Sequence, residues 1–196
     1  DILAALRQWF ADYAEWMVTH PQGIKEMKAG NNHSAAYLVQ LASFARLTGD
    51  TAKLELARKR FKEILAEQMA PNGSFPAELA RTKPYGYAIF QLDCIALLCE
   101  LLSTPNDNLW KFTLHDGRNV AKSVEFLYPY LKDKSKWPYP ADIEHFEHWP
   151  VRQPSLLLAG FALGRPDYLE LWKTLEPDPE NSEVRRNMAV TQPLLW

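Results

Sequence analysis

Polar side chains of the kind that bind anions and move protons occur together at Asn31-Asn32-His33. Asn is a favoured N-cap residue and a run of apolar residues with helical spacing follows, so a helix is expected to begin here. One interpretation is a capped helix with a partly exposed histidine. The alternative is an anion site, because the free N–H groups and positive dipole end of a helix N-terminus attract a carboxylate. Adjacent amide and imidazole groups could then neutralise an acid and move a proton.

A second polar group lies in the segment from Gly73 to Tyr87, which opens onto an apolar stretch of the chain. Its ionisable side chains, in order, are Glu78, Arg81, Lys83, Tyr85 and Tyr87. Polar groups at the mouth of a buried helix cost free energy unless they are hydrogen bonded or used. The segment is therefore either a structural Glu78–Arg81 ion pair beside core tyrosines, or part of a functional site.

A third candidate is the run Glu144-His145-Phe146-Glu147-His148-Trp149. A His-x-x-His pair on a helix can bind a metal ion, and a glutamate could complete the ligand set. The spacing differs from that of His-Glu-x-x-His, and the sequence offers no evident distant ligand. We therefore expect a solvated or groove-edge surface here and no metal site.

Other catalytic patterns are absent from the sequence, including Gly-x-Ser-x-Gly, the P-loop, Gly-x-Gly-x-x-Gly and Cys-x-x-Cys. The two cysteines, Cys94 and Cys99, lie five residues apart on one predicted helix. That spacing separates them by roughly 8 Å, more than the roughly 7 Å that a disulfide spans. We expect free, buried thiols, and neither is flanked by a base that would make it a nucleophile. Free thiols leave the cellular compartment open.

The charge balance argues against a nucleic-acid partner. Lys and Arg number 22 against 24 Asp and Glu, which gives a formal net charge of -2, and no basic block marks a nucleic-acid footprint. No apolar run approaches the roughly 20 residues of a membrane span, so no membrane partner is expected.

Aromatic residues make up 12% of the chain. They fit a protein core, or a carbohydrate-binding surface where flat rings cover the apolar faces of sugars.

Helical periodicity dominates the chain, and no strand-like alternation competes with it. The predicted helices cover Ile2–Val18, 31 or 32 to 48, 51–69, 87–102 and 117–131, with shorter ones near 141–148, 153–163, 166–174 and 180–188. Pro21 and Gly23 are expected to close the first helix, and residues 74–86 to be irregular. Helix 87–102 is apolar almost all round, which indicates burial on both sides. The sequence thus predicts an all-α protein of antiparallel helix pairs, as in a helical toroid or solenoid.

The first two polar groups, in this order, resemble motifs of the alginate lyase family of polysaccharide lyases. The matching text is Asn31-Asn32-His33, followed by Glu78-Leu79-Ala80-Arg81-Thr82-Lys83-Pro84-Tyr85-Gly86-Tyr87. The ending from Arg185-Arg186-Asn187 to Pro193-Leu194-Leu195-Trp196 is also similar to the end of such proteins. The resemblance implies an (α/α) toroid, usually built from a chain about twice this length. We expect residues 1–196 to form a single helical domain, the C-terminal half of a larger toroid, completed by a missing N-terminal segment or a second copy of the chain.

The resemblance also implies a reaction, β-elimination at a 4-linked uronic acid. Asn32 corresponds to the residue that neutralises the substrate carboxylate, and Arg81 to the residue that supports it. His33 corresponds to the assisting histidine, which acts as base when the C5 proton lies on the opposite face. Tyr87 corresponds to the tyrosine that serves as acid, and as base in syn elimination, with Tyr85 as the alternative should the motif be shifted.

The resemblance implies further properties. The expected partner is an acidic polysaccharide, alginate or glucuronan. The reaction is expected to need no metal ion or organic cofactor. The expected location of the protein is periplasmic or secreted. Further substrate-binding residues are expected at Asn31, Glu78, Lys83, Tyr85, Trp137 and Trp149. The main alternative is a non-catalytic polyuronate-binding or assembly protein with the same helical fold, and a weaker one is a helical-repeat interaction scaffold.

Overall fold

A computed structural model describes residues 1–191, and within this range the regular structure is helical, with isolated β-bridges and no strand. The all-α prediction is confirmed. The α-helices are α1 (Ile2–Thr19), α2 (Pro21–Met27), α3 (Asn32–Thr48), α4 (Thr51–Gln68), α5 (Pro76–Leu79), α6 (Pro84–Leu102), α7 (Val120–Lys132), α8 (Pro154–Ala162), α9 (Pro166–Thr174) and α10 (Ser182–Arg186). Two 3-10 turns are η1 (Lys134–Lys136) and η2 (Phe146–His148). The family-like ending at 193–196 lies outside the described residues.

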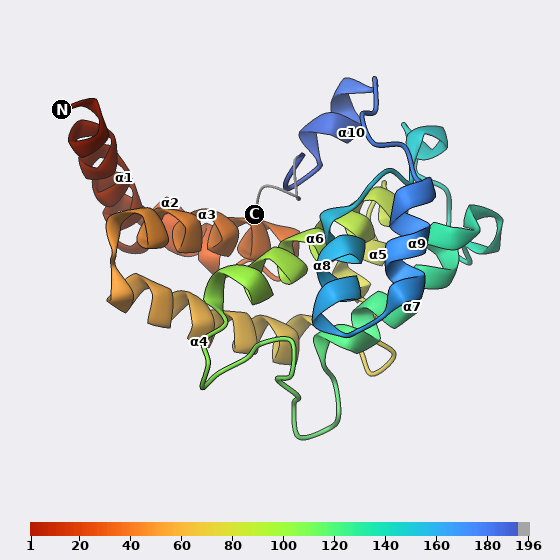
Figure 1. Cartoon of the computed structure of the whole chain (residues 1–196), viewed down its shortest axis with the longest axis horizontal. Helices are drawn as coiled ribbons and strands as arrows, with labels where there is room; N and C mark the ends of the chain where they lie inside the picture. Colours follow the sequence, from red (N-terminus) through yellow and green to blue (C-terminus); the bar gives the residue numbers. More distant parts are fainter. Residues whose placement is uncertain (192–196) are drawn as a thin grey trace.

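The main helices form two rows that alternate along the chain (Figure 1). Helices α3, α6 and α8 pack side by side in one row, and α1 packs on the free side of α3. In the second row, α4 contacts α3 and α6, α7 contacts α6 and α8, and α9 contacts α8. This alternation is the pattern of an (α/α) toroid, as the sequence predicts.

Helix α6 is the centre of the core, since it packs against α3, α4, α5, α7 and α8. The predicted burial on both sides is confirmed, and all of these neighbours belong to this chain. The 19 residues of α6 are also enough to cross a membrane by length and composition, contrary to the sequence expectation. Because 83% of the apolar window is buried inside the protein, α6 is better explained as a core helix. Exposed large apolar side chains occur instead on α1, at Ile2, Leu3, Leu6, Trp9 and Trp16.

Several helix ends follow the local sequence signals. Asn31 is the N-cap of α3, and its Oδ1 accepts a hydrogen bond from the His33 backbone N–H at 3.1 Å. The same helix ends at Gly49, which adopts φ 75°, a left-handed conformation that glycine reaches without strain. Asp50 caps the next helix through the Lys53 backbone N–H. These boundaries confirm the predicted second helix and, to within one residue, the third.

Prolines begin helices at places where the sequence did not predict a helix start. The first helix ends at Thr19, just before Pro21, as expected, but Pro21 also begins α2, because the fixed φ of proline and its missing N–H suit the first turn of a helix. Pro84 likewise begins α6, three residues before the predicted start at Tyr87. A third proline, Pro76, begins the short α5 inside the segment expected to be irregular.

Two further boundary predictions are wrong. The helix expected over 141–148 is a bend followed by η2, and His145 adopts φ 63°, which no helix accommodates. The helix expected from Gly117 starts at Val120, because the side chain of Asn119 provides its N-cap by accepting the Lys122 backbone N–H at 3.1 Å.

Buried carboxylates from distant elements cap the two core helices that begin with proline and lack a local cap. Asp142 accepts the backbone N–H groups of Tyr85 and Gly86 at 2.7 and 2.9 Å, at the start of α6. Asp93, in the middle of α6, accepts the Ser155 backbone N–H at 3.1 Å, at the start of α8. Burial raises the pKa of Asp93 to about 7. These contacts fix the ends of α6 and α8 relative to the rest of the fold.

Gly23 sets how closely α2 approaches α1. A substitution at this position therefore tests the packing of the two helices. A Cβ atom at this position would lie 2.1 Å from the backbone oxygen of Met17. We expect Gly23→Ala to lower the free energy of unfolding by roughly 1–3 kcal/mol, because the backbone must shift to relieve the overlap. Urea denaturation measures the change. Gly30→Ala is the matched control, since nothing lies within 4 Å of a Cβ there; a loss as large as that of Gly23→Ala would contradict this packing.

Candidate active site

A cleft of about 580 Å³ lies where α1, α2, the N-terminus of α3 and the N-terminus of α6 meet. Its polar lining includes Gln22, Glu26, Asn32, His33, Gln40, Arg81, Tyr87 and Asn187. Its aromatic lining includes Tyr13, Trp16, Tyr37 and Phe90. The four residues for which the sequence suggested catalytic roles, Asn32, His33, Arg81 and Tyr87, therefore line one cleft, although they come from two separate segments of the chain.

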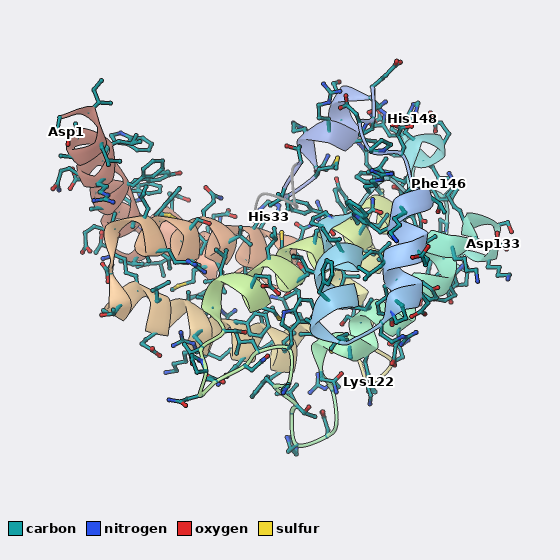
Figure 2. The ribbon with its side chains drawn as sticks, in the orientation of Figure 1. Asp1, His33, Lys122, Asp133, Phe146 and His148 are labelled. Atoms are coloured by element: carbon teal, nitrogen blue, oxygen red, sulfur yellow. The ribbon has the colours of Figure 1, made fainter. Side chains whose placement is uncertain are left out.

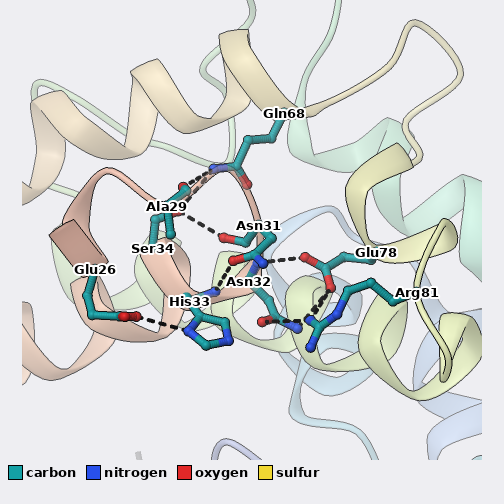
Figure 3. A network of polar contacts seen from close by, with 9 residues as sticks. All are labelled: Glu26, Ala29, Asn31, Asn32, His33, Ser34, Gln68, Glu78 and Arg81. Carbon is teal, nitrogen blue, oxygen red and sulfur yellow. Dashed lines mark hydrogen bonds and ion pairs between the residues drawn. The ribbon is translucent and has the colours of Figure 1, made fainter.

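A buried carboxylate joins these two segments (Figure 3). Glu78 is 0% exposed and accepts two hydrogen bonds from Asn32, one from its backbone N–H at 2.5 Å and one from Nδ2 at 2.9 Å. Arg81 donates to Glu78 at 3.1 Å and to Asn32 Oδ1 at 3.3 Å. Burial raises the pKa of Glu78, and the bonds from Asn32 and Arg81 oppose that rise. The network fixes the orientation of the Asn32 amide, with one Nδ2 hydrogen left for a ligand.

Arg81 also connects this network to Tyr87. Its guanidinium carbon lies 3.6 Å from the centroid of the Tyr87 ring, a cation–π contact. Tyr87 is half-buried and lines the cleft. A phenol, a guanidinium and an oriented amide are thus presented to the same space.

Two of the predicted binding residues are core residues. Tyr85 is 0% exposed, and its hydroxyl donates to the backbone oxygen of Tyr130 at 2.9 Å. Burial raises its pKa. Trp137 packs edge-on against Tyr85, with 4.9 Å between ring centroids, and donates through Nε1 to the Pro140 oxygen. As placed, neither side chain can touch a ligand in the cleft, which corrects the expectation that they bind substrate.

Four other predicted binding residues lie beside the cleft rather than on its lining. The Asn31 side chain caps α3, and Glu78 is enclosed in the network described above. Lys83 and Trp149 line a small neighbouring hollow that also touches Tyr87. There Lys83 Nζ pairs with Glu144 at 3.0 Å. Their positions suit support of the cleft lining better than direct binding.

The third sequence motif does not line this cleft, although its Glu144, His145 and Trp149 line the neighbouring hollow. Figure 2 shows Phe146 and His148 well away from His33, on the side of the molecule where α9 and α10 lie. His145 and His148 have ring centroids 6.2 Å apart, and His145 Nδ1 lies 3.2 Å from Asn181 Nδ2. Among residues 1–191 no group of three or more His, Cys, Asp or Glu side chains is placed to hold a metal ion.

The sequence reading missed the wall that α1 and α2 contribute to the cleft. Tyr13 and Trp16 have the spacing of the apolar face of the first helix, yet Trp16 is 44% exposed and both residues line the cleft. A partly exposed Trp beside a polar site is a signal that spacing alone did not reveal. Glu26 was missed because α2 was not predicted.

An amide, a guanidinium, an imidazole and a phenol thus line one cleft of an alternating (α/α) fold. The sequence matches the family model described as alginate lyase over residues 1–137, and the chain belongs to the alginate lyase family. It is similar to the crystal structure of an alginate lyase from Bacteroides ovatus, with 32% sequence identity and a TM-score of 0.74. That match covers 96% of this chain and 50% of the other, so this chain spans about half the length of that relative. No curated protein matches. That residues 1–196 are the C-terminal half of a larger toroid stays a prediction.

The buried network leads to a prediction about stability. Glu78→Gln keeps the shape of the side chain but replaces one acceptor oxygen with an NH₂ group that faces the donors of Asn32 or Arg81. A buried donor left without an acceptor costs about 1–3 kcal/mol, so we expect a loss of that size in urea denaturation. Glu170→Gln is the control, since Glu170 forms an exposed i,i+3 pair with Lys173 and should change stability by less than about 0.5 kcal/mol. Equal losses in the two variants would refute the role of the network.

Proposed function

We propose that this chain carries the catalytic cleft of a polysaccharide lyase that cleaves a 4-linked polyuronate by β-elimination. The observation that carries the proposal is the convergence of Asn32, His33, Arg81 and Tyr87 on one cleft. Membership of the alginate lyase family supports the reaction, and the Bacteroides ovatus relative, an alginate lyase, supports alginate as the substrate. Glucuronan is the second candidate substrate.

Charge neutralisation is the first requirement of the reaction. The C5 proton of a uronic acid is weakly acidic because it lies next to a carboxylate, and its removal places further negative charge on that group. Asn32 and Arg81 offer N–H donors to this carboxylate, and Glu78 holds both donors in place before the substrate arrives. Donors that need no reorientation stabilise the transition state more than the ground state.

Proton transfer is the second requirement. Tyr87 donates a proton to the leaving O4 oxygen, and the guanidinium of Arg81 over its ring stabilises the negative charge that develops on it. In syn elimination Tyr87 also takes the C5 proton. When that proton lies on the opposite face of the sugar, His33 is the base. The protein itself supplies charge neutralisation and proton transfer in this scheme.

The aromatic wall gives the cleft a surface for sugar rings. Trp16 and Tyr13 line it from α1, and Trp16 is exposed enough to cover the apolar face of a sugar. We assign the stacking of sugar rings to these residues rather than to Trp137 and Trp149, the tryptophans expected to bind substrate, because both of those are buried. A periplasmic or secreted location is part of the proposal, since a polymeric acidic substrate would be met outside the cytoplasm.

A non-catalytic polyuronate-binding protein is the alternative, and it would use the same cleft. Incubation with a panel of polyuronates separates the two. A lyase generates products with a C4=C5 double bond, which absorb ultraviolet light, whereas a binding protein retains acidic oligosaccharides without such products. Binding without product formation across the panel would overturn the proposed activity.

Tyr87 allows the sharpest test of the chemistry. Tyr87→Phe keeps the ring under Arg81 and removes only the acid, so we expect an unchanged melting temperature and a fall in kcat of roughly 100-fold or more. The ultraviolet absorbance of the unsaturated product measures the rate.

Tyr85→Phe is the matched control for this variant. It removes the buried bond to the Tyr130 oxygen and should cost about 1 kcal/mol of stability while the folded protein stays active. If Tyr85→Phe abolished product formation and Tyr87→Phe did not, the assignment of the acid to Tyr87 would be wrong.

Trp16 allows a test of the binding wall. Without its ring, Trp16→Ala loses a stacking surface in the cleft, and we expect KM for oligouronates to rise about 10-fold, or roughly 1.4 kcal/mol of binding, with kcat little changed. Trp9→Ala is the control, because Trp9 is 57% exposed on the same helix but is not part of the cleft lining. A similar rise in KM for both variants would show that the effect comes from α1 as a whole rather than from stacking in the cleft.

A further inference from the structure

His33 has a partner that the sequence motifs do not contain. Its Nδ1 lies 2.9 Å from Oε2 of Glu26, and Figure 3 shows the carboxylate on the side of the ring away from Asn32 and Arg81. Both side chains line the cleft, and both are about half exposed, at 52% and 50%. An ion pair this exposed adds little to folding stability, on the order of 0–1 kcal/mol. Its geometry therefore calls for another explanation.

The position of Glu26 follows from the packing of α2. His20 caps this helix by accepting the Gln22 backbone N–H through Nδ1 at 3.2 Å. Gly23 then lets α2 lie directly against the last turn of α1, where a Cβ would overlap the Met17 oxygen. One turn later, Glu26 faces the N-terminus of α3. The close packing of α2 on α1, which Gly23 permits, thus places the carboxylate of Glu26 beside the imidazole of His33.

We infer that Glu26 is a positioning residue for His33, which it holds as the Nδ1–H tautomer with the lone pair of Nε2 free for the cleft. The reason is that a carboxylate can only accept, so the nitrogen facing it must carry the proton. In a neutral imidazole the other nitrogen is then the base. Once His33 takes a proton, Glu26 also stabilises the resulting imidazolium, as the carboxylate of a catalytic triad does.

This inference rests on the function proposed above. The proton balance of that reaction shows for which substrate the His33 tautomer affects turnover. The C5–H bond breaks and its proton goes to His33 Nε2, while the bonding electrons form the C4=C5 double bond. The C4–O4 bond breaks, and O4 takes a proton from Tyr87. Solvent then removes the proton from His33 and returns one to Tyr87. This route applies where the C5 proton and O4 lie on opposite faces of the ring, as in guluronate, whereas in mannuronate they share a face.

The tautomer can be read without any activity. Long-range ¹H–¹⁵N correlation spectra distinguish the two tautomers of a neutral histidine, and His33→Gln identifies the His33 signals. We expect Nδ1–H in the unaltered protein and in Glu26→Gln, whose amide oxygen still accepts. In Glu26→Ala we expect a shift to Nε2–H, the form preferred in water. Nε2–H in the unaltered protein, or an unchanged tautomer in Glu26→Ala, would overturn the inference.

Turnover of two epimeric substrates supplies the second readout. With polyguluronate, Glu26→Ala should lower kcat by roughly 10-fold or more and leave KM within about two-fold, as expected for a misdirected base. With polymannuronate, kcat should stay within about two-fold, because Tyr87 serves as base. Lys25→Ala, which removes an exposed charge from the same helix, should change neither. Equal losses on both polymers would overturn the inference.

Failure of the proposed function would look different. An unaltered protein that turns over neither polymer would refute the lyase assignment, while the tautomer spectra would still decide whether Glu26 orients His33. Melting temperatures of Glu26→Ala and the unaltered protein should agree, because the pair is exposed. A large loss of stability in Glu26→Ala would show a structural role and overturn the inference.

Discussion

The arrangement of the cleft depends on one buried carboxylate, that of Glu78. It receives three hydrogen bonds, two from the start of α3 and one from Arg81, and it has no exposed surface. A carboxylate taken out of water costs free energy unless donors surround it, so this site is stable only when the two segments meet in this geometry. The same bonds that satisfy Glu78 therefore orient the amide of Asn32 and the guanidinium of Arg81. The bonds that keep the buried carboxylate stable are thus the same bonds that orient these two donors toward the cleft.

The same principle recurs at the ends of the core helices. α6 and α8 begin with proline and have no capping side chain of their own, and Asp142 and Asp93 reach them from 57 and 62 residues away. Gly86 is part of this arrangement, because a Cβ there would lie 3.1 Å from Trp149 Nε1. The first turn of α6 is thus held from outside the helix, which fixes the direction in which Tyr87 leaves it. Distant carboxylates set the position of the phenol as Glu78 sets that of the amide.

The features that the sequence predicted correctly are those that short-range interactions determine. The N-cap at the start of α3, the end of that helix at residue 48 and the all-round apolar character of α6 are short-range signals, and the structure confirms each prediction. The two polar motifs also pointed to one site, because their order resembles that of a known family. Burial was not readable in the same way. Trp137 and Trp16 look alike in a sequence, and only packing makes the first a core residue and the second part of a cleft wall.

The contrast between Tyr85 and Tyr87 shows why a single segment supports both interpretations that the sequence left open. Successive residues of an α-helix are turned by about 100°, so positions two apart point to nearly opposite sides. In the first turns of α6, this places Tyr85 in the core, bonded to the Tyr130 oxygen, and Tyr87 at the cleft under Arg81. The Glu78–Arg81 ion pair is likewise both a buried structural bond and the support of the cleft. Within residues 73–87, the structural interpretation therefore holds for the buried Tyr85 and Glu78, while Arg81 and Tyr87 line the cleft to which the proposed function assigns them.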